Sequence, residues 1–276
     1  MYSSAEDISQ ALEKFRAYRV SANRPVLEKI IPIIERTQPP NPGDGRTEHY
    51  QRLRKEFLES LLESGPLDID KTSELLERWD DFKHIVDGTS VEPDKALRIT
   101  RREAFFSAVE AGLKEKSPEG VRESITVPSE LRLLAEQVDA VWGPGLSEWM
   151  CKFHGAFFSL YDPGLVDTPE IRTDVPCGPS FMDDETGEEF ETAVGFQIGA
   201  GIELECWAIL SRNQDDSDQP WEWRYMINRF EYSLRIFDTI PDSLSCFASM
   251  GEPGEPGMDY WDDIGDRVYE HFRCGG

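Results

Sequence analysis

The hydrophobic residues in the first part of the chain recur at helical spacing. Intervals of three and four, which place apolar residues on one face of a helix, occur in residues 4–19, 26–36, 50–62 and 101–113. Pro25 stands near the start of the second segment, and we expect Pro32 to kink that helix. The pattern therefore predicts a helical N-terminal region over residues 1–116.

After this region the pattern changes to short apolar runs that are typical of strands. These runs cover residues 153–160, 193–198, 203–210 and 221–226. Gly199 and Gly201 favour a tight hairpin between the second and third runs. Pro128 suits the first turn of a helix before the strands, and Thr239 or Asp238 can cap a helix after them. Residues 161–192 are rich in Pro, Asp and Gly, and we expect a loop there.

Strands that follow one another through turns, with helices before and after, indicate an α+β fold. We expect an antiparallel sheet packed by helices and preceded by the helical N-terminal region. The predicted domain boundaries are residues 1–116, residues 117–250 and an acidic, Gly/Pro-rich tail over residues 251–276 that contains a short helix.

Acidic residues are concentrated in the second part of the chain. The net charge is −25, yet residues 1–116 hold 19 Lys and Arg against 22 Asp and Glu, whereas residues 117–276 hold 10 against 32. Such a surface repels nucleic acids and anionic membranes and attracts basic proteins. We therefore expect a basic protein partner and no nucleic acid.

The cysteines and the apolar runs bear on the compartment of the protein. The five cysteines are odd in number and lack CxxC spacing, which favours neither a disulfide framework nor a zinc site. We expect no signal peptide, because the first residues include neither a basic nor an apolar region, and no apolar run approaches the roughly 18 residues of a membrane span. We expect a soluble, cytoplasmic protein with reduced thiols, no cofactor and no metal.

A binding surface is predicted between residues 200 and 226, where aromatic and acidic residues alternate. Aromatic side chains often anchor protein interfaces, although they also fill cores. Exposed carboxylates beside them would steer a basic partner. The residues expected to bind the partner are Trp207, Asp215, Asp216, Asp218, Trp221, Trp223 and Tyr225.

Two other uses of the chain remain open. Glu203 and Glu205 are two residues apart on a predicted strand, so with His154 they could line the cleft of a hydrolase. No residue is assigned as catalytic, because nothing near Cys151 and His154 supplies an orienting partner. The second use is a homodimer through the apolar stripe of Leu53, Phe57, Leu61 and Leu62.

Three segments resemble motifs of the SUKH superfamily, which includes fungal cell-wall-assembly regulators and bacterial immunity proteins. Residues 125–141 look like its opening helix, residues 197–207 like its central strand pair and residues 236–247 like its closing helix. The resemblance covers about residues 115–250, and it departs from the family where residues 140–143 replace the usual Asn-Gly turn. The family binds proteins, so the resemblance implies a non-enzymatic interaction module of regulatory or immunity type.

Overall fold

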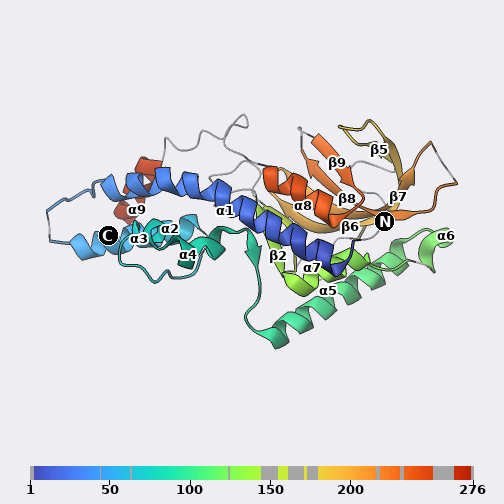
Figure 1. Cartoon of the computed structure of the whole chain (residues 1–276), viewed down its shortest axis with the longest axis horizontal. Helices are drawn as coiled ribbons and strands as arrows, with labels where there is room; N and C mark the ends of the chain where they lie inside the picture. Colours follow the sequence, from blue (N-terminus) through green and yellow to red (C-terminus); the bar gives the residue numbers. More distant parts are fainter. Residues whose placement is uncertain are drawn as a thin grey trace. The chain divides into compact units, whose positions relative to one another are not determined.

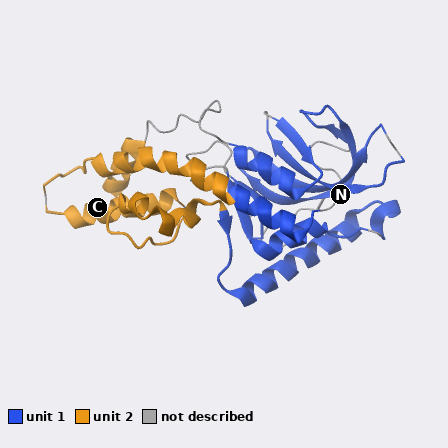
Figure 2. Cartoon of the chain, viewed as in Figure 1, with its two compact units in different colours: residues 1–15, 89–143, 155–250 blue, residues 16–88, 144–154, 251–276 orange. Residues whose placement is uncertain are grey.

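A computed structural model describes most of the chain and has an α+β fold, as predicted (Figure 1). The described residues are 3–43, 45–62, 64–123, 125–143, 155–160, 171–172, 180–215, 218–230, 233–250 and 264–274. They form two compact units (Figure 2). The first unit contains residues 1–15, 89–143 and 155–250, and the second contains residues 16–88, 144–154 and 251–276. The boundaries predicted at residues 116 and 250 do not coincide with the limits of these units. Each unit consists of three segments that are separate in the sequence, so no single boundary divides the two.

Helix α1 (Ala5–Arg36) is one continuous helix where two were predicted. Pro25 and Pro32 both lie inside it, and each costs roughly 3 kcal/mol in a helix interior. The helix is nevertheless amphipathic on both sides of these prolines. Its buried apolar residues are Ile8, Leu12, Phe15, Leu27, Ile30, Ile31 and Ile34. The packing of these side chains offsets the local cost of the prolines.

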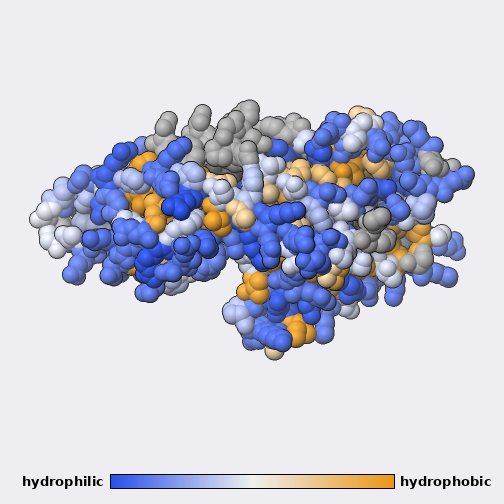
Figure 3. Space-filling model, in the orientation of Figure 1, coloured by the Kyte–Doolittle hydropathy of each residue, from blue (hydrophilic) through white to orange (hydrophobic). Residues whose placement is uncertain are grey.

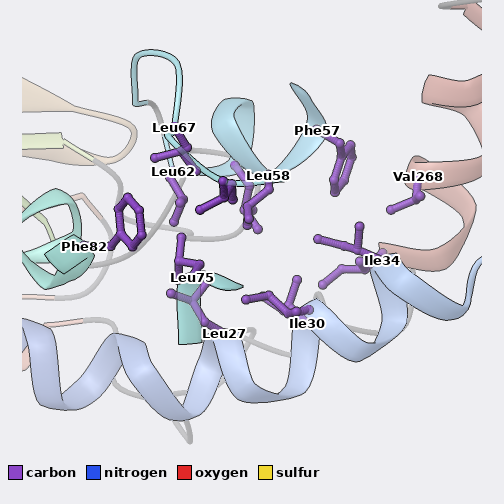
Figure 4. Packing of buried hydrophobic residues seen from close by; sticks show 14 of the residues in the cluster. Leu27, Ile30, Ile34, Phe57, Leu58, Leu62, Leu67, Leu75, Phe82 and Val268 are labelled. Carbon is purple, nitrogen blue, oxygen red and sulfur yellow. The ribbon is translucent and has the colours of Figure 1, made fainter. Parts of the chain in front are cut away.

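The second unit is helical, and its core gathers residues from both ends of the chain (Figure 4). It contains α2 (Thr47–Leu61), α3 (Glu74–Glu77), α4 (Trp79–Phe82), the 3-10 helix η1 (Lys83–Val86) and α9 (Ile264–Cys274). Helix α9 packs on α2, where the rings of Tyr50 and Phe272 meet edge to face at 5.6 Å. The predicted tail helix is thus present and belongs to this core.

The apolar stripe of α2 is covered within the chain. Leu53, Phe57, Leu61 and Leu62 are all buried in the core of the second unit. The stripe is therefore not available as the homodimer surface that the sequence suggested.

In the first unit, nine strands of the described residues form one antiparallel sheet. The strands are β1 (Thr89–Ser90), β2 (Ala140–Gly143), β3 (Gly155–Ser159), β4 (Ile171–Arg172), β5 (Ser180–Met182), β6 (Glu189–Gly201), β7 (Leu204–Asn213), β8 (Glu222–Arg229) and β9 (Ser233–Phe237). They run in the order β1-β2-β3-β6-β7-β8-β9, and β4 and β5 also pair with β6. The predicted hairpin and third strand correspond to β6, β7 and β8. The loop predicted over residues 161–192 is wrong in part, because its described residues include β4, β5 and the start of β6.

Helices pack against this sheet. The ones in direct contact with strands are α5 (Lys95–Lys116) and α8 (Ile240–Ser249), and Thr239 caps α8 as predicted. The first unit also contains α6 (Glu119–Arg122), which contacts α5, and α7 (Ser129–Gln137). Neighbouring strand residues point to opposite faces, and Phe157 of β3 contacts Phe247 of α8 whereas Phe158 contacts Phe105 of α5. Helices α8 and α5 therefore pack on opposite faces of β3.

Two glycines allow β3 to cross β6 closely. A Cβ atom at Gly199 would stand 2.2 Å from the carbonyl oxygen of Ala156, and one at Gly155 would stand 2.6 Å from the Cα of Gly201. No side chain fits at either position, so these glycines permit the bend that curls the sheet.

Strands β5 to β9 curl into a half-barrel, and the turn after β5 bridges its open side. The turn after β5 reaches the free edge of β9, where the Asp184 amide donates to the Leu234 carbonyl at 3.0 Å. The carboxylates of Asp183 and Asp184 accept from the amides of Ile236 at 2.6 Å and Leu234 at 2.5 Å. The barrel interior is filled by Phe181, Phe190, Trp207, Ile209, Met226 and Leu234, with Ile236 beside them. We call this part of the sheet, from β5 to β9, the small barrel.

Candidate functional site

The candidate site is the end of the small barrel at the β7–β8 turn, where exposed carboxylates gather. The Gln214 amide donates to the Glu189 carbonyl at 2.9 Å, which joins this turn to the start of β6. Ser211 of β7 stands opposite Glu222 of β8. We call this end the acidic rim; its described carboxylates are Glu189, Glu191, Asp215, Asp218, Glu222 and Asp238.

Two arginines are held inside the acidic rim. Arg212 donates to one oxygen of Glu191 through Nε at 2.9 Å and through Nη2 at 2.8 Å. Arg224 is buried, donates to Asp238 at 2.9 Å and to the Ser211 carbonyl at 2.9 Å, and lies 5.0 Å from the centre of the Phe190 ring. With six carboxylates and two guanidinium groups, the described part of the rim has a net charge of −4.

Trp221 is the aromatic residue that lies at the acidic rim. Its side chain is half-buried, and the Arg212 guanidinium stands 4.4 Å from the ring centre. A cation over an indole face is attracted by the ring quadrupole, so Arg212 fixes the ring in place. Trp221 thus presents a rigid apolar surface among carboxylates.

The sequence placed seven residues in one binding surface, and the structure brings three of the described ones together. Asp215 and Asp218 are exposed and share the acidic rim with Trp221, whereas Asp216 lies outside the described residues. The remaining three, Trp207, Trp223 and Tyr225, are buried and form no surface strip.

The three buried aromatic residues also occupy opposite faces of the sheet. Trp207 stands opposite Met226 in the register and lies inside the small barrel. Trp223 points to the other face, where its indole donates to the Thr126 carbonyl at 2.9 Å and meets the Phe196 ring edge to face. Side chains alternate between the two faces along each strand, so the register between β7 and β8 decides which residues share a face. The sequence alone does not give this register, and the separation of Trp207 from Trp223 was therefore not predicted.

The structure does not place Glu203 and Glu205 on one strand face. Gly201 pairs with Leu204, which leaves Ile202 and Glu203 as a two-residue turn, with Glu203 at φ +52°. Glu205 lies on β7, where its carboxylate accepts from the Trp207 indole at 3.3 Å. His154, the third member of the hydrolase alternative, lies outside the described residues.

The opposite end of the small barrel is polar as well, a feature that the sequence analysis missed. Glu205 pairs with Asn228 and Trp207 pairs with Gln197, so these residues share the barrel-facing side. Gln197 is 7% exposed and Asn228 9% exposed. Only the register across β6, β7 and β8 brings them together.

Burial affects two of the three described cysteines, Cys206 and Cys246. Burial raises the pKa of the Cys206 thiol well above its ordinary value, and burial also raises the pKa of Cys246.

Among the described residues, no group of three or more His, Cys, Asp or Glu side chains is arranged to hold a metal ion. The described helices likewise include none that is long and apolar enough to cross a membrane. The face drawn in Figure 3 is mostly hydrophilic, with apolar residues in separate patches.

Comparison with known proteins gives no indication of function, so the functional argument rests on the geometry of the two barrel ends. No protein-family model, no curated protein and no solved structure matches the chain significantly.

Proposed function

We propose that this chain is a non-enzymatic, acidic protein-interaction module of SUKH-like type that binds a basic protein partner. The observation that carries the proposal is the acidic rim, where exposed carboxylates share one end of the barrel with a half-exposed indole. The carboxylates attract a basic surface over a distance, and the indole supplies a contact that forms after the encounter. Regulatory and immunity proteins both use such binding.

The electrostatic pattern at the rim supports binding by steering. The two rim arginines are engaged by Glu191, Glu222 and Asp238, so they neutralise those carboxylates in part. Asp215 and Asp218 at the turn are exposed and extend the negative charge outward. A cluster of one sign at the end of a barrel raises the association rate of an oppositely charged partner by about 10- to 1,000-fold at low salt.

The test compares two variants with the same change in charge. The rim variant is D215N/D218N/E222Q, and the control is E103Q/E115Q/E119Q, which neutralises two exposed carboxylates of α5 and one of α6. A partner is first captured from the native source and identified by mass spectrometry, and its association rate is then measured by stopped flow. The rim variant should associate about tenfold more slowly at low salt and show a weaker salt dependence.

The control is expected to associate within about twofold of the wild-type rate, because its three charges belong to helices α5 and α6 and not to the rim. Equal rates for the two variants would show that only total charge matters and would overturn the proposal. A rim variant that associates as fast as wild type would overturn it too.

A further inference from the structure

We infer that the polar end of the small barrel is a binding site for a primary ammonium group, the group at the end of a lysine side chain. The site consists of Gln197, Glu205 and Asn228, which we call the polar triad. This inference rests on the proposed function, since it names one chemical group of the basic partner, but it concerns the end of the barrel opposite the acidic rim.

The register places the polar triad on one side of the sheet. Glu205 stands opposite Asn228, and Gln197 stands opposite Trp207, two residues from Glu205 along β7. Directly paired side chains lie about 5 Å apart at Cβ, and diagonal pairs about 7–8 Å apart. Strands β6, β7 and β8 lie next to one another in the sheet (Figure 1), so the three side chains lie on the same side of neighbouring strands.

The two carboxamides of the triad lack partners. Gln197 and Asn228 are more than nine-tenths buried, and neither forms a side-chain hydrogen bond with any residue that the structure describes. The amide atoms of both side chains keep contact with solvent, so they are not orphaned in the interior. Two carboxamides without protein partners on one side of a sheet are therefore open to an incoming hydrogen-bond donor.

The carboxylate of Glu205 determines the sign of this ligand. It is half-buried and accepts a long hydrogen bond from the Trp207 indole, and no ion pair joins it to a described Lys or Arg. Arg224, which faces the same barrel interior, is bound to Asp238 and Ser211 at the other end. A partly buried carboxylate without a cation favours the binding of one.

The number of acceptors selects the kind of cation. An ammonium group has three N–H donors, and the triad offers three side-chain acceptors, namely one carboxylate and two amide oxygens. A guanidinium group presents a planar fork that matches a carboxylate bidentately, whereas here the acceptors are spread over three strands. The apolar stem of the bound residue can lie toward Ile202 and Phe230, which are exposed beside the turn, where the Phe230 amide donates to the Glu203 carbonyl.

The test uses a small probe and requires no known partner. N-acetyl-lysine methylamide is titrated into the full-length protein, and its norleucine analogue, which lacks the ammonium group, serves as the ligand control. The side-chain amide signals of Gln197 and Asn228 and the indole signal of Trp207 are followed by NMR. Lysine should shift these signals in a saturable way, and norleucine should leave them unchanged. Equal shifts with both ligands, or none with lysine, would overturn the inference.

Two single variants separate local binding from general attraction to an acidic protein. Glu205→Gln should weaken lysine binding at least tenfold, whereas Glu203→Gln, which removes the same charge from the adjacent turn, should change it by less than about twofold. Equal losses in both would show nonspecific attraction and would contradict the site. Should Glu205→Gln fail to fold, Asn228→Ala tests the same point, with at least a threefold loss expected.

The outcomes distinguish this inference from the proposed function. Loss of lysine binding with normal partner association leaves the acidic rim as the interaction surface and removes only the triad site. Normal lysine binding with unchanged association of the rim variant removes the rim and keeps the triad site.

Discussion

At the scale of single residues, Glu130 connects three parts of the first unit. It is a buried carboxylate on α7 that accepts from the Ser3 amide at 2.5 Å and from the Ile240 amide at 3.1 Å. These amides lie at the starts of α1 and α8, where helix N-termini leave backbone donors without partners. The carboxylate satisfies both donors and also suits the positive ends of the two helix dipoles.

Replacing Glu130 should therefore destabilise the fold. Removal of the carboxylate in Glu130→Ala leaves the buried Ile240 amide and the part-buried Ser3 amide without an acceptor, at a cost of about 1–3 kcal/mol in the free energy of unfolding. Urea unfolding followed by circular dichroism measures this change. Glu136→Ala, an exposed position on the same helix, should change the free energy by less than about 0.5 kcal/mol. A midpoint of Glu130→Ala equal to that of this control would contradict the role.

The cysteines are predicted to differ strongly in reactivity. The thiolate is the reactive form, and burial keeps the Cys206 thiol protonated at neutral pH by raising its pKa well above the ordinary value. Cys274 is exposed. Alkylation under native conditions, read by peptide mass spectrometry, should label Cys274 first and Cys206 only after unfolding. Early labelling of Cys206 would show that its strand opens readily.

At the scale of elements, the sequence predicted which segments are helices and strands better than it predicted the contacts between distant segments. The hairpin of β6 and β7, the third strand β8 and the Thr239 cap of α8 follow from local patterns, and all are present. Helix α5 was expected from residue 101, but it starts after Asp94, whose carboxylate accepts from the Ala96 and Leu97 amides. That cap was readable from the sequence, whereas the closure of the barrel by Asp183 and Asp184 depends on residues some 50 positions apart.

This closure makes a prediction about the edge of β9. Asp183→Ala removes the acceptor for the Ile236 amide, so the edge of β9 loses a hydrogen bond and hydrogen exchange at this amide should accelerate. The free energy of unfolding should fall by about 1–3 kcal/mol. Glu188→Ala, at an exposed position of the same connection, is the matched control. Unchanged protection of Ile236 in Asp183→Ala would show that the edge is held by other contacts.

At the scale of the whole molecule, the candidate site could be predicted only in part. Asp215, Asp218 and Trp221 were found because charge and aromatic residues are visible in the sequence. Gln197 and Asn228 were not, because single amides carry no signal until the register pairs their strands. The grouping of α9 with α2 was missed for a similar reason, since no local pattern links segments about 200 residues apart.

The packing of α9 is predicted to stabilise the second unit. Phe272 is fully buried against Tyr50, and the Arg54 guanidinium lies 5.4 Å from the centre of its ring. Phe272→Ala should lower the free energy of unfolding by about 3–5 kcal/mol. Tyr269→Ala, on the exposed side of the same helix, should cost less than about 1 kcal/mol. Thermal unfolding of the two variants compares them, and equal losses would mean that α9 contributes no core contact.

The position of α9 in the sequence also has a consequence for biosynthesis. The core that begins with α1 and α2 is not complete until residue 272 has been translated and has emerged from the ribosome. During most of synthesis, the nascent chain therefore carries the apolar surface of Tyr50 and Phe57 without its cover. Such a surface is a typical target of chaperones, so the second unit should depend on them more than the first during elongation.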